Sequence, residues 1–193
     1  MGLAKSRSFR SDASGFSLIE VLIATLLLAT SLVTLAQLFA LSTQSNAGAR
    51  NTTFSALLAH QKLEELRALT WGFDAQGLPI SDTTTNTAVS PETPAGGTGL
   101  APSPVGSLGA NTNGYVDYIG QFGDKLGGGI VAPPNTVFVR RWSVEPLPSN
   151  PNNTLILQVL VFRNGDRGAA NNGAGRVLPD EARLVTVKTR KSK

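Results

Sequence analysis

The chain has 193 residues, enough for one domain of ordinary size with an appendage, and it contains no cysteine. Disulfides, thiolate metal sites and cysteine nucleophiles are therefore excluded. The formal net charge is +4, and the basic excess lies at the two ends of the sequence, so the composition does not support a general nucleic-acid-binding surface.

The first long feature is an apolar run from Leu18 to Leu41, in which Glu20 is the only charged residue. The run is longer than the roughly 20 apolar residues that span a bilayer as a helix. Basic residues precede it and none follows until Arg50, which predicts a cytoplasmic N-terminus and an exported remainder. The preceding basic residues are Lys5, Arg7 and Arg10.

Two other interpretations fit the run less well. A buried core helix would be apolar too, but it would not need this length. A removable signal peptide would have a shorter apolar region followed by small residues, and Thr34-Leu35-Ala36 could serve as its cleavage site. The apolar run continues past Ala36 to Leu41, which favours a helix that stays in the mature protein.

Glu20 is an unusual residue for such a run, because a charge at the centre of a membrane helix costs about 2.5–3.5 kcal/mol. A helix that began at Phe16 would place Glu20 only about 6 Å along its axis, near the headgroup region. That position lowers the cost but does not explain the residue. A carboxylate inside a membrane segment indicates a function and requires a partner.

The segment GFSLIEVLIA, Gly15–Ala24, resembles the class III signal of type IV prepilins and pseudopilins. The resemblance lies in the short basic leader, the glycine, the aromatic residue and the glutamate that opens an apolar helix. It implies that prepilin peptidase cleaves after Gly15 and that Phe16 becomes the N-methylated first residue. It also implies that Glu20 pairs with the N-terminal ammonium of a neighbouring subunit and so sets the axial register of a filament.

The helical pattern continues beyond the membrane segment, and we predict one helix from about Ser17 to about Leu69, roughly 80 Å long. Its second half is amphipathic and requires a domain to lie on. The predicted apolar stripe consists of Ala56, Ala59, Leu63, Leu66 and Thr70, widened by Phe54, Leu57, Leu58 and Leu69. The predicted polar side consists of Gln61, Lys62, Glu64, Glu65 and Arg67.

Two departures from major type IVa pilins refine the resemblance. Those proteins usually carry a proline at the position of Gln37 and often a C-terminal cysteine pair, and this chain has neither. The phrase ALLAHQKLEELRAL is similar to PilV-type minor pilins and to minor pseudopilins of type II secretion. The resemblance therefore implies a minor subunit.

Residues 72–135 are rich in Gly, Pro, Thr, Ser and Asn, and they are predicted to form a long surface loop with one short strand at Tyr115–Ile119. Three stronger strand patterns follow at Thr136–Glu145, Asn153–Arg163 and Ala182–Arg190. The short turn between the first two predicts an antiparallel hairpin. The expected fold class is α+β and pilin-like, with the long N-terminal helix packed on a small antiparallel sheet.

Other candidate sites are weaker. Asp166 with Asn164, Asn171 and Asn172 does not have the spacing of an EF-hand, so no metal is predicted there. His60, the only histidine, is expected on the surface of the helix, and no serine lies in a nucleophile elbow. Trp71 and Trp142 are expected in the core or an interface. The pair Arg140-Arg141 places one arginine on each face of a strand. One of the two is expected either to extend its charged end to solvent or to pair with an acid such as Glu64 or Glu65.

We therefore expect a non-enzymatic, minor pilin-like subunit without cofactors that joins or primes assembly of a type IV pilus. The alternatives are a minor pseudopilin of a type II secretion system and a membrane-tethered periplasmic binding domain. The expected partners are other pilins or pseudopilins, prepilin peptidase and the inner-membrane assembly platform, and the expected location is the bacterial inner membrane and then the filament. The predicted parts are a leader (1–15), a transmembrane and filament-core half-helix (16–41), an amphipathic half-helix (42–71), a variable loop (72–135) and a sheet region (136–193).

Overall fold

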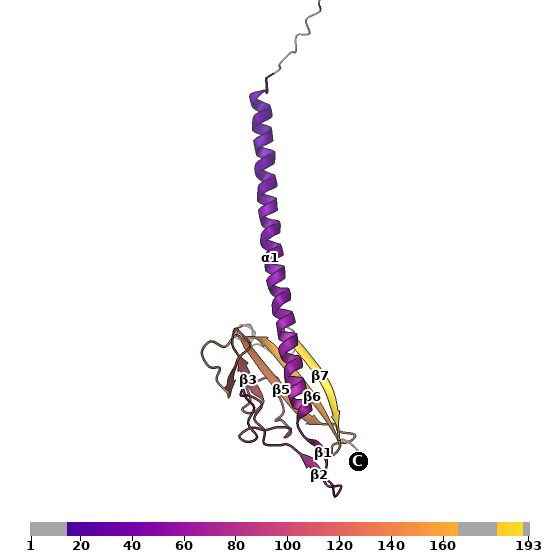
Figure 1. Cartoon of the computed structure of the whole chain (residues 1–193). Helices are drawn as coiled ribbons and strands as arrows, with labels where there is room; N and C mark the ends of the chain where they lie inside the picture. The colour runs from indigo at the N-terminus through magenta and orange to yellow at the C-terminus, as the bar shows by residue number, and fades with distance from the viewer. Residues whose placement is uncertain (1–14, 166–180, 191–193) are drawn as a thin grey trace, which may run out of the picture. The chain divides into compact units, whose positions relative to one another are not determined.

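The computed structural model of the chain describes residues 15–165 and 181–190. The chain divides into two compact units, Met1–Ser45 and Asn46–Lys193. One long helix, α1 (Leu18–Ala68), begins in the first unit and ends in the second, and the remaining elements are antiparallel strands of the second unit. The predicted α+β class is therefore confirmed (Figure 1).

Helix α1 has 51 residues, which corresponds to about 77 Å at the usual rise per residue. The first proline of the chain is Pro79, so every residue of α1 keeps the backbone N–H that a helical hydrogen bond requires. At the end of the helix, the ammonium of Lys188 donates to the carbonyl of Arg67, one of the last-turn carbonyls that have no partner within a helix. The predicted helix of residues 17–69 is confirmed to within one residue at each end.

A small hairpin follows α1. Strands β1 (Trp71–Phe73) and β2 (Pro79–Ser81) pair antiparallel with each other and form a separate two-stranded sheet. The turn between them is closed by Asp74, whose Oδ1 accepts hydrogen bonds from the backbone N–H groups of Gln76 (2.9 Å) and Leu78 (2.8 Å). Such side-chain bonds to the backbone two or more residues ahead are typical of aspartate in turns.

The main sheet has five antiparallel strands in the order β4-β3-β5-β6-β7. Its strands are β3 (Val116–Ile119), β4 (Lys125–Gly128), β5 (Phe138–Pro146), β6 (Thr154–Arg163) and β7 (Ala182–Thr189). The predicted hairpin is confirmed, since β5 and β6 pair along their length in one register with Trp142 opposite Val159. The predicted short strand and the three longer ones are all present.

The part of α1 that belongs to the second unit lies across one face of this sheet (Figure 1). Leu58, Ala59, Leu63 and Leu66 of the helix share one core with the sheet. Alternate residues of β6 face this core, as the period of a strand requires. They are Leu155, Leu157, Val159 and Val161.

A second apolar cluster lies on the opposite face of the sheet. It consists of Val116, Tyr118, Val139, Leu160 and Phe162, against which Leu108, Leu126 and Ala132 pack. The central strands β3, β5 and β6 are therefore buried on both faces, which explains the nearly continuous apolar sequence of β6.

The segment 72–135 differs from the predicted surface loop, because it contains β2 and β4 besides the predicted short strand and contributes to the core. Ala88 and Leu100 are buried in the main cluster, and the carbonyl of Thr87 accepts hydrogen bonds from Lys62 (2.6 Å) and Lys125 (3.1 Å). The composition conceals this packing because small side chains and backbone groups provide many of the buried contacts.

The helix face in contact with the sheet also differs from the predicted stripe. Ala56 and Leu57 are exposed, whereas Lys62, predicted on the polar side, is fully buried. Lys62 lies one helical turn from Leu58 and Leu66, so its position in the helix directs it toward the sheet. Its ammonium group contacts the carboxylate of Asp117 in β3.

The two leucines Leu66 and Leu57 provide a matched test of this packing. Leu66 is 0% exposed and Leu57 is 63% exposed. Leu66→Ala is expected to lower the free energy of unfolding by about 2–5 kcal/mol because it leaves a cavity. Leu57→Ala is expected to change it by less than about 0.5 kcal/mol. Urea unfolding of the full chain in detergent micelles, followed by near-ultraviolet circular dichroism, measures both; equal losses would contradict the observed helix face.

Candidate functional site

The residues of the predicted cleavage signal lie at the start of α1. Gly15, Phe16 and Ser17 precede the first helical turn, and Phe16 is 87% exposed. A Cβ added at Gly15 would meet no atom within 4 Å. A side chain at the predicted cleavage position would thus meet open space among the described residues.

Glu20 has a local partner in this chain. The N–H of Ser17 donates to Oε2 of Glu20 at 3.0 Å, and the carbonyl of Ser17 accepts the first backbone hydrogen bonds of the helix from Glu20 and Val21. This arrangement is one half of a capping box, in which the third residue of a helix satisfies the N–H of the residue that precedes it. Glu20 therefore stabilises the helix start as well as carrying a charge beside an apolar segment.

The first half of α1 is long and apolar enough to cross a membrane by length and composition. None of the residues in its most apolar window is buried, so the described chain does not cover its apolar side chains. Its hydroxyl groups are satisfied within the helix: Thr25, Thr30, Ser31 and Thr34 each donate to a backbone carbonyl three or four residues earlier. Such bonds let a helix carry hydroxyl groups into an apolar environment.

The second unit contains a buried ionic cluster that the sequence analysis did not predict. At its centre is Asp117 of β3, which is fully buried between Arg140 of β5 and Lys62 of α1. Nε and Nη2 of Arg140 donate to the two carboxylate oxygens at 2.8 Å each. Nζ of Lys62 lies 2.9 Å from Oδ2. This is a bidentate pair with a second cation on the same carboxylate.

Arg140 also joins the sheet to the helix directly, because its Nη1 donates to the carbonyl of Leu58 at 3.0 Å. The prediction that one of the two arginines pairs with an acid is confirmed for Arg140, but the acid is Asp117 of the neighbouring strand and not Glu64 or Glu65. Antiparallel pairing places Asp117 opposite Arg140 in the β3–β5 register, and residues opposite each other on adjacent strands lie within easy reach of a salt bridge.

Arg141 points to the other face, as the alternation of a strand predicts. Its Nε and Nη2 donate to Oδ1 of Asn111 at 2.9 and 2.7 Å, and its guanidinium lies 4.8 Å from the ring centroid of Phe162. It therefore holds the loop before β3 against the second apolar cluster.

Lys62 has a complete set of acceptors despite its burial. Besides Asp117, Nζ contacts the carbonyl of Thr87 at 2.6 Å and Oε2 of Glu65 at 3.2 Å, and it lies 4.1 Å from the ring centroid of Trp142. Glu65 also pairs with Lys125 of β4 at 2.9 Å. The cluster thus connects the helix, three strands and the loop that contains Thr87.

The charges of the cluster shift the pKa values of its members. Burial by itself raises the pKa of Asp117, but the adjacent Lys62 and Arg140 more than offset this effect and hold the pKa below its ordinary value of 3.8. Burial lowers the pKa of Lys62, and the charge of Asp117 opposes that shift. The carboxylate is therefore the ionised centre on which the two cations depend.

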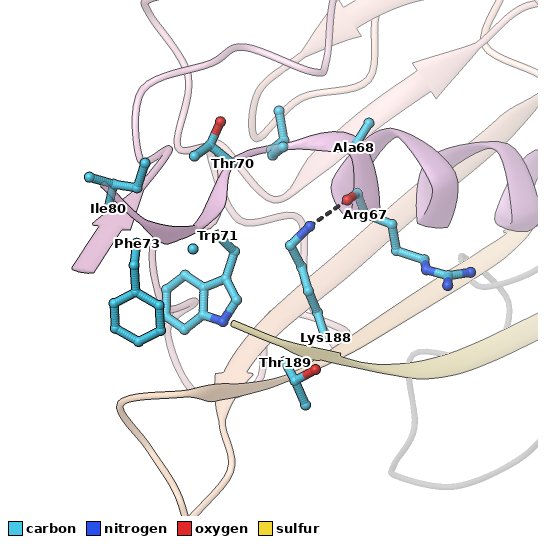
Figure 2. Close-up of a pocket in the computed structure, with 10 residues that line it drawn as sticks. Arg67, Ala68, Thr70, Trp71, Phe73, Ile80, Lys188 and Thr189 are labelled. Atoms are coloured by element: carbon cyan, nitrogen blue, oxygen red, sulfur yellow. Dashed lines mark hydrogen bonds between the residues drawn. The ribbon is translucent and has the colours of Figure 1, made fainter. Parts of the chain in front are cut away.

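A second feature of this unit is an open hollow of about 340 Å³ between the end of α1, the β1–β2 hairpin and the end of β7. Figure 2 shows the rings of Trp71 and Phe73 on one side of it and Lys188, whose ammonium donates to the carbonyl of Arg67, on the other. Trp142 is in the core, as one of the two expected positions requires, whereas Trp71 is half-buried and packs against the edge of that core.

Arg190 holds the hairpin beside this hollow. Its guanidinium lies 3.6 Å from the ring centroid of Trp71 and donates to the carbonyls of Gly72 (3.0 Å) and Ile80 (2.7 Å). The stacking and the hydrogen bonds fix the orientation of both strands of the hairpin relative to the end of β7.

The remaining candidate residues of the sequence lie apart from these features. His60 is exposed on α1. Among residues 15–165 and 181–190, no three His, Asp or Glu side chains come together in a way that could hold a metal ion. Other candidates lie outside the described residues: Asp166, Asn171 and Asn172, and the basic residues of the leader, Lys5, Arg7 and Arg10.

No protein-family model, curated protein or solved structure matches the chain.

Asp117→Asn tests the dependence of the fold on the central carboxylate. The substitution removes the carboxylate that the buried cations Lys62 and Arg140 share and leaves Arg140 without its bidentate partner, while Glu65 still contacts Lys62. We therefore expect a loss of about 3–5 kcal/mol in the free energy of unfolding. Glu64→Gln is the matched control, because it breaks the exposed Glu64–Arg67 pair (2.9 Å) and is expected to cost less than about 0.5 kcal/mol. Urea unfolding of the full chain in micelles measures both variants.

The pH dependence of that loss provides an independent readout. Because the folded-state pKa of Asp117 is lowered, its ionised form stabilises the fold at all pH values well above 3.8, and this contribution is lost as the pH falls through the folded-state pKa. The difference between wild type and Asp117→Asn should therefore be constant near neutral pH and shrink in acid. A difference that stays constant in acid would contradict the assigned role of the charge.

Proposed function

We propose that the chain is a minor pilin-like structural subunit that prepilin peptidase cleaves between Gly15 and Phe16 and that joins or primes assembly of a type IV pilus. The observation that carries the proposal is the division of one continuous helix into two environments. The first half of α1 is apolar and uncovered by the described chain, while the second half is buried against a sheet. The proposed cleavage position, between Gly15 and Phe16, lies immediately before this apolar half.

This division supports storage in a membrane followed by transfer into a helical bundle. From Leu18 to Leu41 the helix would extend about 36 Å, which exceeds the roughly 30 Å of a hydrocarbon core. Cleavage before this segment, rather than after it, retains the helix in the mature protein. Lipid and the helices of other subunits are then two environments that can cover the apolar surface of this half-helix. Neither requires the second unit to change its structure.

Glu20 would provide the specific contact in such a bundle. Cleavage creates an α-ammonium on Phe16, and an isolated carboxylate among apolar helices is strongly unfavourable unless a cation pairs with it. The bond from Ser17 to Oε2 does not prevent this pairing, because a carboxylate accepts several hydrogen bonds. Pairing with the ammonium of a neighbouring subunit would then set the axial register between helices.

The cleavage step is tested by producing the full chain with and without a prepilin peptidase and measuring its intact mass and N-terminal residue. We expect a peptidase-dependent product that begins with Phe16 and carries one additional methyl group. Gly15→Leu should prevent cleavage because the side chain obstructs access to the backbone. Gly48→Ala, at an open position of α1, is the matched glycine control and should be processed normally. A chain whose N-terminus stays intact in the presence of the peptidase would refute the proposal.

The role of Glu20 is tested separately in cells that assemble filaments. Glu20→Gln should be cleaved normally, but its recovery in sheared filaments should fall at least about tenfold because it removes the charge that pairs with the ammonium. Glu64→Gln removes an exposed carboxylate of the same helix and should leave recovery unchanged. Normal recovery of Glu20→Gln would assign Glu20 to helix capping alone.

A further inference from the structure

The two edges of the main sheet differ in their regularity. Strand β4 has four residues, ends in Gly127-Gly128 and has a register shift in its pairing with β3. Strand β7 has eight residues, contains neither glycine nor proline, and pairs with β6 in one continuous register. Bulges and short lengths protect an edge from pairing with another chain, and β7 has neither protection.

The outward backbone groups of β7 can be assigned from its register. The N–H of Arg190 donates to the carbonyl of Asn153 at 2.8 Å, so this pair is a hydrogen-bonded one at the end of the β6–β7 ladder. Hydrogen-bonded and non-hydrogen-bonded pairs alternate in an antiparallel ladder. The N–H and C=O groups that point away from β6 therefore belong to the residues that we call the β7 edge: Arg183, Val185, Val187 and Thr189.

The side chains of the β7 edge lie on the face of the sheet opposite α1. Val185 is 57% exposed and Val187 is 55% exposed, although both are β-branched apolar residues on a regular strand. The alternate residues Ala182 and Leu184 pack against the core beneath α1. The β7 edge thus combines outward backbone groups, unpaired among the described residues, with exposed apolar side chains.

The hollow described above lies at the carboxyl end of this strand. Lys188 and Thr189 of β7 line it together with Trp71, Phe73 and Ile80 (Figure 2). An extended segment lying along β7 would therefore reach an aromatic-lined depression at one end. Backbone pairing with a sheet edge provides affinity in this mode of recognition, and a side-chain pocket provides specificity.

The basic residues at the two ends of β7 favour an acidic partner. Arg183 donates to Oε1 of Gln158 and Arg190 donates to backbone carbonyls, and neither has a carboxylate within 4.0 Å among the described residues. Two copies of β7 paired antiparallel would bring Arg183 of one copy toward the basic end of the other, which is unfavourable. An acidic segment would instead be attracted by Arg190 at the carboxyl end of the strand and by Arg183 at the amino end, where the nearby Glu181 offsets part of the charge.

We infer that the β7 edge docks an extended, acidic segment of a partner protein, which adds to the sheet as a strand and places one large apolar side chain in the hollow. The inference goes beyond the proposed function and does not depend on it, because it uses only residues of the second unit.

The test uses the full chain in neutral detergent micelles and a fluorescein-labelled, end-capped peptide of about ten residues, the length of a long strand. The peptide alternates valine and threonine, with glutamates at both ends and one tryptophan. A second peptide has lysines in place of the glutamates. Fluorescence anisotropy should show saturable binding of the acidic peptide and at least about tenfold weaker binding of the basic one.

Val185→Pro removes an outward N–H without removing a bond to β6, and proline is tolerated at such edge positions. It should weaken binding of the acidic peptide at least about tenfold, while Val185→Thr, which keeps the N–H, should change it less than about twofold. Arg183→Glu is a second variant that keeps the backbone intact, and it should reduce the preference for the acidic peptide. Unchanged unfolding midpoints establish that the variants fold.

Three outcomes would overturn the inference. The first is absence of saturable binding, and the second is binding that Val185→Pro and Arg183→Glu leave unchanged. The third is concentration-dependent self-association that Val185→Pro abolishes, which would assign the β7 edge to a second copy of this chain.

Discussion

The second unit depends on one buried carboxylate. Asp117 of β3 accepts both hydrogen bonds of the Arg140 fork from β5 and contacts Lys62 of α1. Buried ion pairs do not necessarily add stability, because desolvation opposes their attraction. Their geometric requirements are nevertheless strict. Lys62 must reach the carboxylate of Asp117 while the carbonyl of Leu58 accepts a hydrogen bond from Arg140, and both contacts form together only at one rotation and one axial position of α1. The cluster therefore specifies how the helix lies on the sheet, and apolar packing provides most of the attraction.

Glu20, like Asp117, is a carboxylate in apolar surroundings that requires a cation, but the proposed source of its cation is another subunit. Asp117 finds two cations within its own chain, whereas Glu20, among the described residues, accepts only from the N–H of Ser17 and lies beside an apolar segment. A carboxylate that is satisfied internally fixes the structure of a subunit. A carboxylate that lacks an internal cation can fix the relation between subunits, provided that the neighbour supplies the charge. The proposed cleavage would supply it, since each cut chain gains an ammonium on Phe16 that can pair with Glu20 of a neighbouring subunit.

The sequence predicts the elements better than it predicts the contacts among polar residues. The helix and the three long strands follow from apolar periodicity, which is local and extends over many residues. The burial of Lys62 does not follow from this periodicity, because its neighbours Gln61 and Glu64 are polar. Its anion, Asp117, lies far along the sequence. The packing of residues 72–135 was missed because Ala88 and the carbonyl of Thr87 carry no compositional signal. Polar contacts between distant segments become visible only once the strand register is known.

The two proposed contact surfaces differ in their physical chemistry, and that difference separates their roles. Contacts along the apolar half of α1 would be buried in lipid or among helices, where mobile ions scarcely screen the pairing of Glu20. Contacts at the β7 edge would lie at the surface of the second unit, where Arg183 attracts an acidic segment through solvent and salt weakens that attraction. The helix would thus provide an association that persists over a wide range of ionic strength. The β7 edge would provide one that is selective and reversible, as recruitment of a partner to an assembled subunit requires.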